Sequence, residues 1–349
     1  MAGSSLTAVA AQSAQIAVAA LGGFLFHLLG IPAAWMSGAM VAVVIWGAVG
    51  LTRPMPRPLA DAAMLVSGAT MGAGITPEAV AAVGRYPVSL VILALGVVAV
   101  SGASMLWLIR VAGWRRDDAL LASVPGALST VLAIAADRNA AVAAIVVVQS
   151  VRLFVIIALL PSIVVAIGGG APTLLPGEGH PVTSAGGLAV VLIGGLALGV
   201  LFERLRIAAP VLLGGTVVSA ALHATGSAPG VVPPPLAVAG LVLIGLFIGE
   251  RFRTLELSSL ARVLPAALGS LVISTLVAMV FAALAAKLAR VGLADAMVAF
   301  APGGLEAMMV LALILGLDPL YVGVHHIARF LGIAMALPFA VSLLGRGRR

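Results

Sequence analysis

Apolar stretches long enough to cross a bilayer, roughly 17–25 residues each, recur from one end of the chain to the other. Of the 349 residues, 62% are hydrophobic and only 9% are charged. An ordinary soluble domain has about 25% charged residues. The pattern therefore predicts an all-α, polytopic membrane protein that lies in a lipid bilayer.

The basic residues, which give a formal net charge of +7, lie in short loops between the apolar segments and do not form a basic domain. This distribution argues against direct nucleic-acid binding and is typical of residues that set membrane orientation. The first basic residue is Arg53, so the basic region of a cleavable signal peptide is missing and we expect the first apolar run to be retained. The chain has no cysteine, which excludes disulfides and thiolate metal sites.

An internal duplication is visible when the sequence is compared with itself at an offset of 177 positions (295 − 118, 302 − 125, 329 − 152). The offset aligns Asp118 with Asp295, Pro125-Gly126 with Pro302-Gly303, and Arg152 with Arg329. In an apolar chain, matches between charged residues and prolines carry more weight than matches between aliphatic ones. We predict two membrane repeats, residues 1–170 and 187–349, joined by an extracytoplasmic linker at 171–186.

Each repeat has the same predicted order of elements. The first contains helices at 15–29, 33–50, 58–73, 87–110 and 140–167, a surface helix that opens at Thr76, and a broken element at 118–137. The second contains helices at 187–202, 209–223, 235–250, 262–286 and 319–344, with a broken element at 295–316.

The positions of the basic residues select a topology. If each broken element is re-entrant, each repeat crosses about five times and the second repeat is inverted. With the N-terminus inside, only Arg85, Lys287 and Arg290 then lie outside. If both broken elements span the membrane, the basic residues are divided more evenly. We therefore predict inverted repeats in an inner membrane, with both termini cytoplasmic.

Proline and glycine interrupt the broken elements at Pro125-Gly126 and at Pro302-Gly303-Gly304. Broken backbone at membrane depth is tolerated where protein or a water-filled cavity satisfies it. Helix N-termini exposed at the two breaks would attract an anion. The alternative is that both are only packing breaks.

Two arginines, Arg152 and Arg329, lie near the middle of long apolar segments at equivalent positions. Cations at this depth are costly, so they should face the protein interior and a partner. They could bind an anionic substrate, or they could form structural ion pairs or hydrogen bonds to carbonyls of the broken helices. Glu306 could carry a proton or neutralise Arg329, and Ser129 takes its place in the first repeat.

Two further groups of polar residues could contribute. His325 and His326 precede Arg329 on one predicted helix and could relay protons, or they could be satisfied buried residues. Asp118 and Asp295 are expected to be N-caps, and Asp318 a turn or cap residue. No set of residues has metal-ligand spacing, so we predict neither a metal site nor a cofactor.

Three motifs resemble the AbrB-type membrane protein family, whose members carry a duplicated domain. They are Ile31-Pro-Ala-Ala-Trp-Met-Ser-Gly38, Ala301-Pro-Gly-Gly-Leu-Glu-Ala-Met308, and His325-His-Ile-Ala-Arg329 followed by Pro338. The family usually has adjacent acid and methionine after Pro-Gly-Gly, whereas an alanine separates them here. This resemblance is not to the soluble DNA-binding AbrB fold. Members of the family have been described as regulators of gene expression, and some as ammonia monooxygenase. The sequence has no set of copper or iron ligands that would support the second description.

Inverted repeats with discontinuous helices are a common plan of secondary transporters, whose sites lie where the repeats meet. We therefore predict a secondary transporter for a small, anionic metabolite, with proton coupling left open. The sequence contains no nucleotide-binding motif, which argues against an ATP-driven pump. The alternative is a membrane-embedded regulator of gene expression that acts through a ligand or partner. The sequence shows no pair of a nucleophile and a base, so we do not predict an enzyme. The oligomeric state stays open, and a homo-oligomer is one possibility.

Overall fold

The computed structural model describes residues 2–75, 84, 86–126, 131, 134–135, 140–168, 181–254 and 257–346. Within these ranges the secondary structure is helical apart from one isolated β-bridge between Val182 and Val231. Seven helical segments of the described residues are long and apolar enough to cross a membrane. They lie in α1 (Ala2–Leu28), α5 (Tyr86–Arg110), α8 (Val142–Ala166), α9 (Ala185–Arg204), α11 (Pro234–Gly249) with η2 (Glu250–Thr254), α12 (Leu257–Ala289) and α15 (Pro319–Arg346). The predicted all-α, multi-pass membrane fold is confirmed.

Three further predicted membrane helices are shorter. They are α2 (Ala34–Ala48), α3 (Arg57–Ala73) and α10 (Pro210–Ala224). Their 15, 17 and 15 residues rise about 22–26 Å, a little less than the thickness of a hydrocarbon core. The surface helix predicted from Thr76 lies outside the described residues, so the number of crossings stays a prediction.

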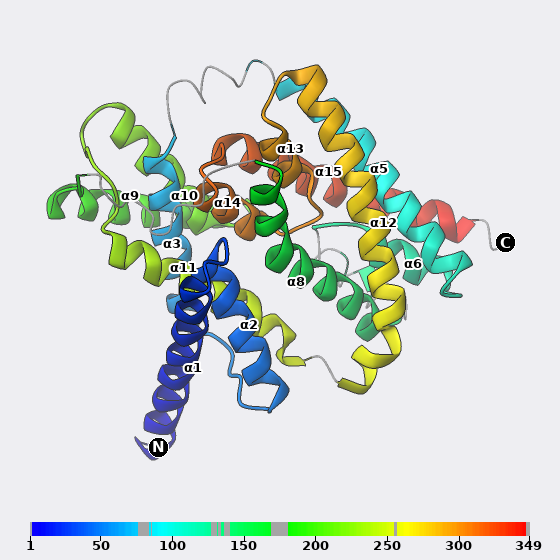
Figure 1. Cartoon of the computed structure of the whole chain (residues 1–349), viewed down its shortest axis with the longest axis horizontal. Coiled ribbons are helices and arrows are strands. Elements are labelled where there is room, and N and C mark those ends of the chain that lie inside the picture. The colour runs from blue at the N-terminus through cyan, green and yellow to red at the C-terminus, as the bar shows by residue number, and fades with distance from the viewer. Residues whose placement is uncertain are drawn as a thin grey trace. The chain divides into compact units, whose positions relative to one another are not determined.

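The helices form two compact units that alternate along the chain (Figure 1). The first unit comprises Met1–Ala81, Pro161–Thr254 and Met309–Leu320. The second comprises Ala82–Leu160, Leu255–Met308 and Tyr321–Arg349. Each unit therefore contains segments from both halves of the sequence.

Close packing in the first unit depends on glycines at two helix crossings. A β carbon at Gly68 of α3 would collide with the carbonyl oxygen of Leu212 on α10. A β carbon at Gly245 of α11 would likewise collide with the carbonyl oxygen of Met36 on α2. Small residues let helix backbones approach in a membrane, where dispersion contacts are a main source of helix association.

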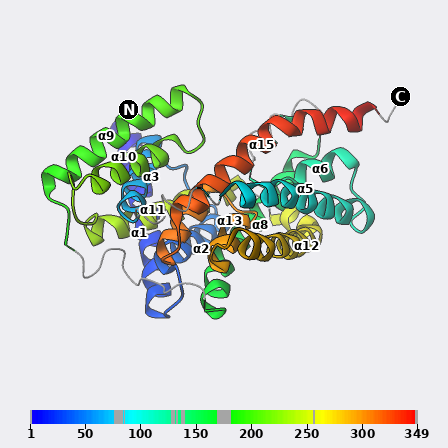
Figure 2. The same cartoon turned by 90° about the horizontal axis from the view of Figure 1, so that it is seen from above.

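Two long helices of the second unit, α5 and α12, pack against each other and lie side by side in Figures 1 and 2. Ser104 Oγ lies 2.6 Å from Ser270 Oγ, and Gly96 faces the ring of Phe281. Higher residue numbers on α5 thus meet lower numbers on α12, so the two helices are antiparallel. Their outer faces expose aliphatic side chains such as Leu95 and Leu276, as a lipid-facing surface does.

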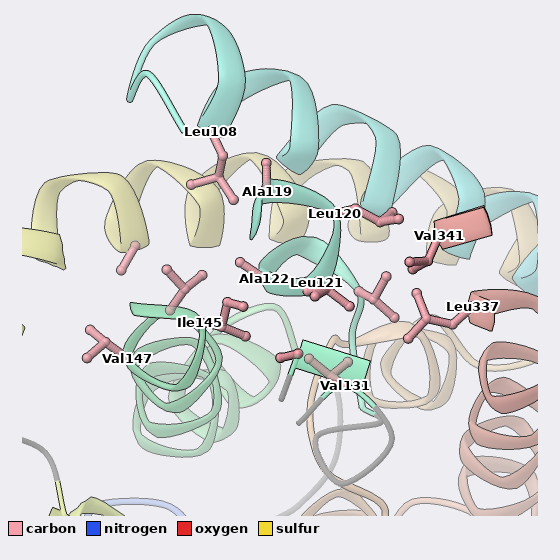
Figure 3. Close-up of a cluster of buried hydrophobic side chains, with 14 of the residues drawn as sticks. Leu108, Ala119, Leu120, Leu121, Ala122, Val131, Ile145, Val147, Leu337 and Val341 are labelled. Atoms are coloured by element: carbon pink, nitrogen blue, oxygen red, sulfur yellow. The ribbon is translucent and has the colours of Figure 1, made fainter. Parts of the chain in front are cut away.

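An aliphatic core joins the shorter helix α6 (Arg116–Ser123) to its neighbours in the second unit. Figure 3 shows Ala119–Ala122 of α6 between Leu108 of α5 and the pair Ile145 and Val147 of α8. Leu337 and Val341 of α15 complete the same cluster. This packing holds α6 in a fixed position although the helix has only 8 residues.

The second broken element is confirmed as two half-helices, α13 (Leu293–Phe300) and α14 (Leu305–Ile314). Their 8 and 10 residues rise about 12 and 15 Å, so neither crosses a bilayer alone. In the first broken element, α6 ends at Ser123 and the described chain continues to Gly126.

The N-cap assignments of Asp118 and Asp295 were wrong. Helix α6 has Arg115 at its N-cap and α13 has Gly292, so both aspartates lie in the first turn. Asp118 is buried and accepts a hydrogen bond from the backbone N–H of Ala141, at the start of α8. It therefore joins two helices instead of capping its own.

Backbone geometry recurs along the chain at nearly one offset. Left-handed residues pair as Gly30 with Arg206, Ala33 with Ala209, Gly50 with Gly226, and Gly113 with Arg290. The offsets are 176 for the first three pairs and 177 for the last (206 − 30, 209 − 33, 226 − 50, 290 − 113). The starts of α6 and α13 also differ by 177 (293 − 116), as do those of α8 and α15 (319 − 142).

Candidate functional site

Two buried arginines hold the carbonyl ends of the half-helices in the second unit. Arg152 of α8 donates from Nη1 to the Ser123 carbonyl and from Nη2 to the Val124 carbonyl, both at 3.2 Å. Arg329 of α15 donates from Nη1 to the Ala301 carbonyl at 2.6 Å and from Nη2 to the Gly303 carbonyl at 2.7 Å. The last carbonyls of a helix lack intrahelical donors and carry partial negative charge, so guanidinium groups stabilise the breaks.

A second side chain on each long helix holds the preceding turn. Gln149 Nε2 donates to the carbonyl of Leu121 at 2.9 Å, and His326 Nε2 lies 3.1 Å from the carbonyl of Val298. Both contacts have the same offset of 177 (326 − 149, 298 − 121). The contacts of Arg152 with Val124 and of Arg329 with Ala301 share it (329 − 152, 301 − 124).

The charges of the two arginines are not compensated by ion pairs in the part of the chain that the structure describes. Arg152 is 2% exposed and Arg329 is 5% exposed. The ion pairs found there join Arg57 to Asp61 and to Glu203. Dipolar carbonyl groups only partly offset a full positive charge, so the region keeps a positive potential in a low-dielectric setting.

A small cavity lies beside Arg329. Its volume of about 10 Å³ admits one water-sized group. The lining residues come from α5, α12, α13, α15 and both breaks: Leu93, Gly96, Val97, Val100, Pro125, Ala278, Phe300, Pro302 and Arg329. The Nε of Arg329 is buried and finds no hydrogen-bond partner within the described residues. The cavity therefore combines apolar walls with one charged group that has donor capacity to spare.

The first break reaches the same arginine. Gly126 has φ +83°, and a β carbon there would lie 3.3 Å from Arg329 Nε. The structure thus brings together the predicted residues Pro125, Gly126, Pro302, Gly303 and Arg329. Arg152 holds the first break but is not among the residues that line the cavity.

Glu306 lies in the first turn of α14, where a negative charge suits the helix dipole, and it is half-buried. No ion pair joins it to Arg329 among the described residues, and both of its predicted roles, carrying a proton and neutralising Arg329, stay predictions. A β carbon at Gly304 would lie 3.5 Å from Glu306 Oε2. Ser129, its predicted counterpart, lies outside the described residues.

Sequence reasoning did not find the partners of His325. Its Nε2 lies 2.5 Å from Ser89 Oγ on α5, which in turn lies 2.5 Å from the hydroxyl of Tyr321. The Nδ1 of His325 lies 2.8 Å from the Tyr321 carbonyl. All three side chains are buried. Tyr321 precedes His325 by one helical turn and was a local signal, whereas Ser89 is remote in sequence.

One protein family, described as transition state regulatory protein AbrB, matches residues 35–345 of the chain. The match covers both breaks and all the residues of the candidate site. The chain matches no curated protein.

Proposed function

Because this chain belongs to the AbrB family and is a multi-pass membrane protein, we propose that it is a secondary transporter that moves a small organic anion by alternating access. The observation that carries the proposal is the buried Arg329, which meets both breaks and whose Nε, at a cavity, has no hydrogen-bond partner among the described residues. Intramembrane cations without a carboxylate partner favour an anionic ligand.

The cavity walls favour one class of anion. Apart from Arg329 they are formed by aliphatic and proline residues, glycine and one phenylalanine. A second or third negative charge would find no further cation among the lining residues and would lose its hydration. We therefore expect a monocarboxylate with a short apolar body. Its carboxylate would accept from Arg329 Nε, and the walls would have to move apart to admit the rest.

The recurrence of contacts supports a duplicated, inverted design. The arginine contacts with the breaks, and the contacts that Gln149 and His326 make with the preceding turns, recur at an offset of 177. The left-handed residues recur at offsets of 176 or 177. The equivalent helices α5 and α12 run antiparallel, as two inverted repeats require. Transporters built from inverted repeats with broken helices bind substrate at the repeat interface.

Counterflow in proteoliposomes tests the proposal without assuming a coupling ion. Purified protein would be loaded with an unlabelled acid, and exchange with external labelled acid would be followed. The panel includes mono-, di- and tricarboxylates of low passive permeability, a sulfonate and phosphate. Arg329→Gln is the test variant, and Arg110→Gln, on the exposed last turn of α5, is the matched loss of a positive charge.

We expect counterflow of monocarboxylates by the native protein and by Arg110→Gln, and its loss in Arg329→Gln. Should Arg329→Gln fail to fold, Arg329→Lys, which keeps the charge but lacks Nε, is expected to raise the KM. Folded native protein that exchanges no member of the panel would overturn the proposal. That result would favour the regulator of gene expression.

A further inference from the structure

The adjacent histidines of α15 have different freedom to accept a proton. His326 Nε2 faces the carbonyl of Val298, and its Nδ1 lies 2.5 Å from Arg329 Nη2. A carbonyl only accepts and a guanidinium only donates, so Nε2 carries the hydrogen and Nδ1 is the acceptor. A second proton on Nδ1 would set two donors against each other. His326 is thereby fixed as a neutral positioning residue for Arg329.

His325 has a partner that can reverse its role. Its Nδ1 faces the Tyr321 carbonyl and therefore carries a hydrogen, which leaves Nε2 as the acceptor from Ser89 Oγ. Ser89 in turn can accept from the Tyr321 hydroxyl. Hydroxyl groups rotate between donor and acceptor geometry. When a proton binds Nε2, Ser89 can accept from it and turn its own O–H toward Tyr321.

The surroundings of His325 connect it to the cavity. Among the described residues, the titratable and charged groups that face it are Tyr86 from α5 and Tyr321, His326 and Arg329 from α15. From α13, the ring of Phe300 lies 5.9 Å from the imidazole, centroid to centroid, and also lines the cavity. The positive charge of Arg329, one turn away, acts on His325. A protonated His325 is therefore repelled unless a negative charge is close to Arg329.

We propose that His325, with Ser89 and Tyr321, is the proton-carrying group of the transporter, and that its protonation is coupled to anion binding at Arg329. The inference rests on the proposed transport function. The proton comes from hydronium on the side where the site is open: an O–H bond of the hydronium breaks, an N–H bond forms at Nε2 and a water molecule is left, and the reverse transfer returns the proton to water on the other side. Binding equilibria are reciprocal, so the anion favours the proton as much as the proton favours the anion. One proton and one monocarboxylate then move together without net charge.

The coupling has no counterpart in the first half of the chain. The positions 177 residues before Tyr321 and His325 are Ala144 and Val148, neither of which titrates (321 − 177, 325 − 177). The position 177 residues after Ser89 is Ala266 (89 + 177). Among the described residues, Arg152 holds its break through the carbonyls of Ser123 and Val124 without such a cluster. Because the duplicated fold then has a single proton site, one proton is transported with each anion.

The test compares counterflow with accumulation driven by an inward proton gradient in the same proteoliposomes, using the best monocarboxylate of the panel. His325→Gln cannot take up a proton. We expect it to retain counterflow but to lose accumulation by tenfold or more. His223→Gln, a histidine of the first unit bonded to Ser219, is the control and is expected to accumulate normally.

Persistent gradient-driven accumulation in His325→Gln would overturn the inference and leave the transport function intact. Absence of counterflow in the native protein would instead reject the proposed function. If His325→Gln does not fold, calorimetry of monocarboxylate binding in buffers of different ionisation enthalpy gives the number of protons taken up by the native protein. Zero protons overturns the inference. Uptake that Ser89→Ala shifts to a different pH range supports it.

Discussion

Gly126 lies directly beside the guanidinium of Arg329: a β carbon on this glycine would be 3.3 Å from Nε and 3.5 Å from Nη2. The two residues are 203 positions apart (329 − 126) and belong to the two predicted repeats. The left-handed backbone of Gly126, with φ +83°, turns the first break toward the arginine of the second. The close approach leaves no room for a side chain between the break and the free nitrogen.

Gly126→Ala is therefore expected to impair the site itself. The methyl group would crowd Nε and weaken substrate binding by about 1.4 kcal/mol, which raises the KM of counterflow about tenfold. Gly113→Ala is the matched control, since Gly113 has φ +72° and a β carbon added there would meet no atom within 4 Å. Both variants carry the strain of a left-handed alanine, about 1–2 kcal/mol. An equal KM change in both would show that strain alone matters.

His326→Gln is expected to preserve the fold. Glutamine in this place can donate to the Val298 carbonyl as Gln149 does to the Leu121 carbonyl, so we expect a change in unfolding free energy below about 1 kcal/mol. His326→Leu leaves that carbonyl without its donor and should cost about 1–3 kcal/mol. Thermal unfolding in detergent measures both, and similar losses in both variants would contradict the proposed positioning role.

Arg110 and Lys287 test the inverted topology. They occupy equivalent positions (287 − 110 = 177) in the exposed last turns of α5 and α12. Because these helices are antiparallel, we expect the two side chains on opposite sides of the membrane. The chain has no native cysteine, so Arg110→Cys and Lys287→Cys give labelling without background. A membrane-impermeant maleimide should label only Lys287→Cys in intact cells, and labelling of both would reject inversion.

Gly68→Ala and Gly245→Ala should each destabilise the first unit. Each added methyl would meet a carbonyl oxygen of the facing helix, of Leu212 or of Met36, and overpacking of this kind costs about 1–3 kcal/mol. Gly102→Ala on α5 has open space and should change the midpoint of thermal unfolding little. Comparable midpoints for all three variants would show that the crossings can relax.

The helices and the second break were predictable because their signals are local. Pro302 and Gly303 interrupt an apolar run, and α13 and α14 end and begin within three residues of them. Tertiary contacts were less accessible. A sequence pattern does not show that Asp118 accepts from Ala141 or that Ser89 meets His325, because those partners are set by packing. Of the two readings of the arginines, hydrogen bonding to carbonyls of the broken helices is confirmed, and anion binding stays a prediction.

The antiparallel pair α5 and α12 carries a mechanical consequence. Phe281 sits over Gly96, and the indole of Trp107 sits over Gly269, so each helix holds an aromatic ring in a notch of the other. If α5 slid along α12 by one helical turn, both rings would leave their glycines and collide with residues that have side chains. The pair is thereby locked in register. A motion that widens the neighbouring cavity would therefore rotate α5 and α12 together as a rigid body, or bend the chain at the two breaks.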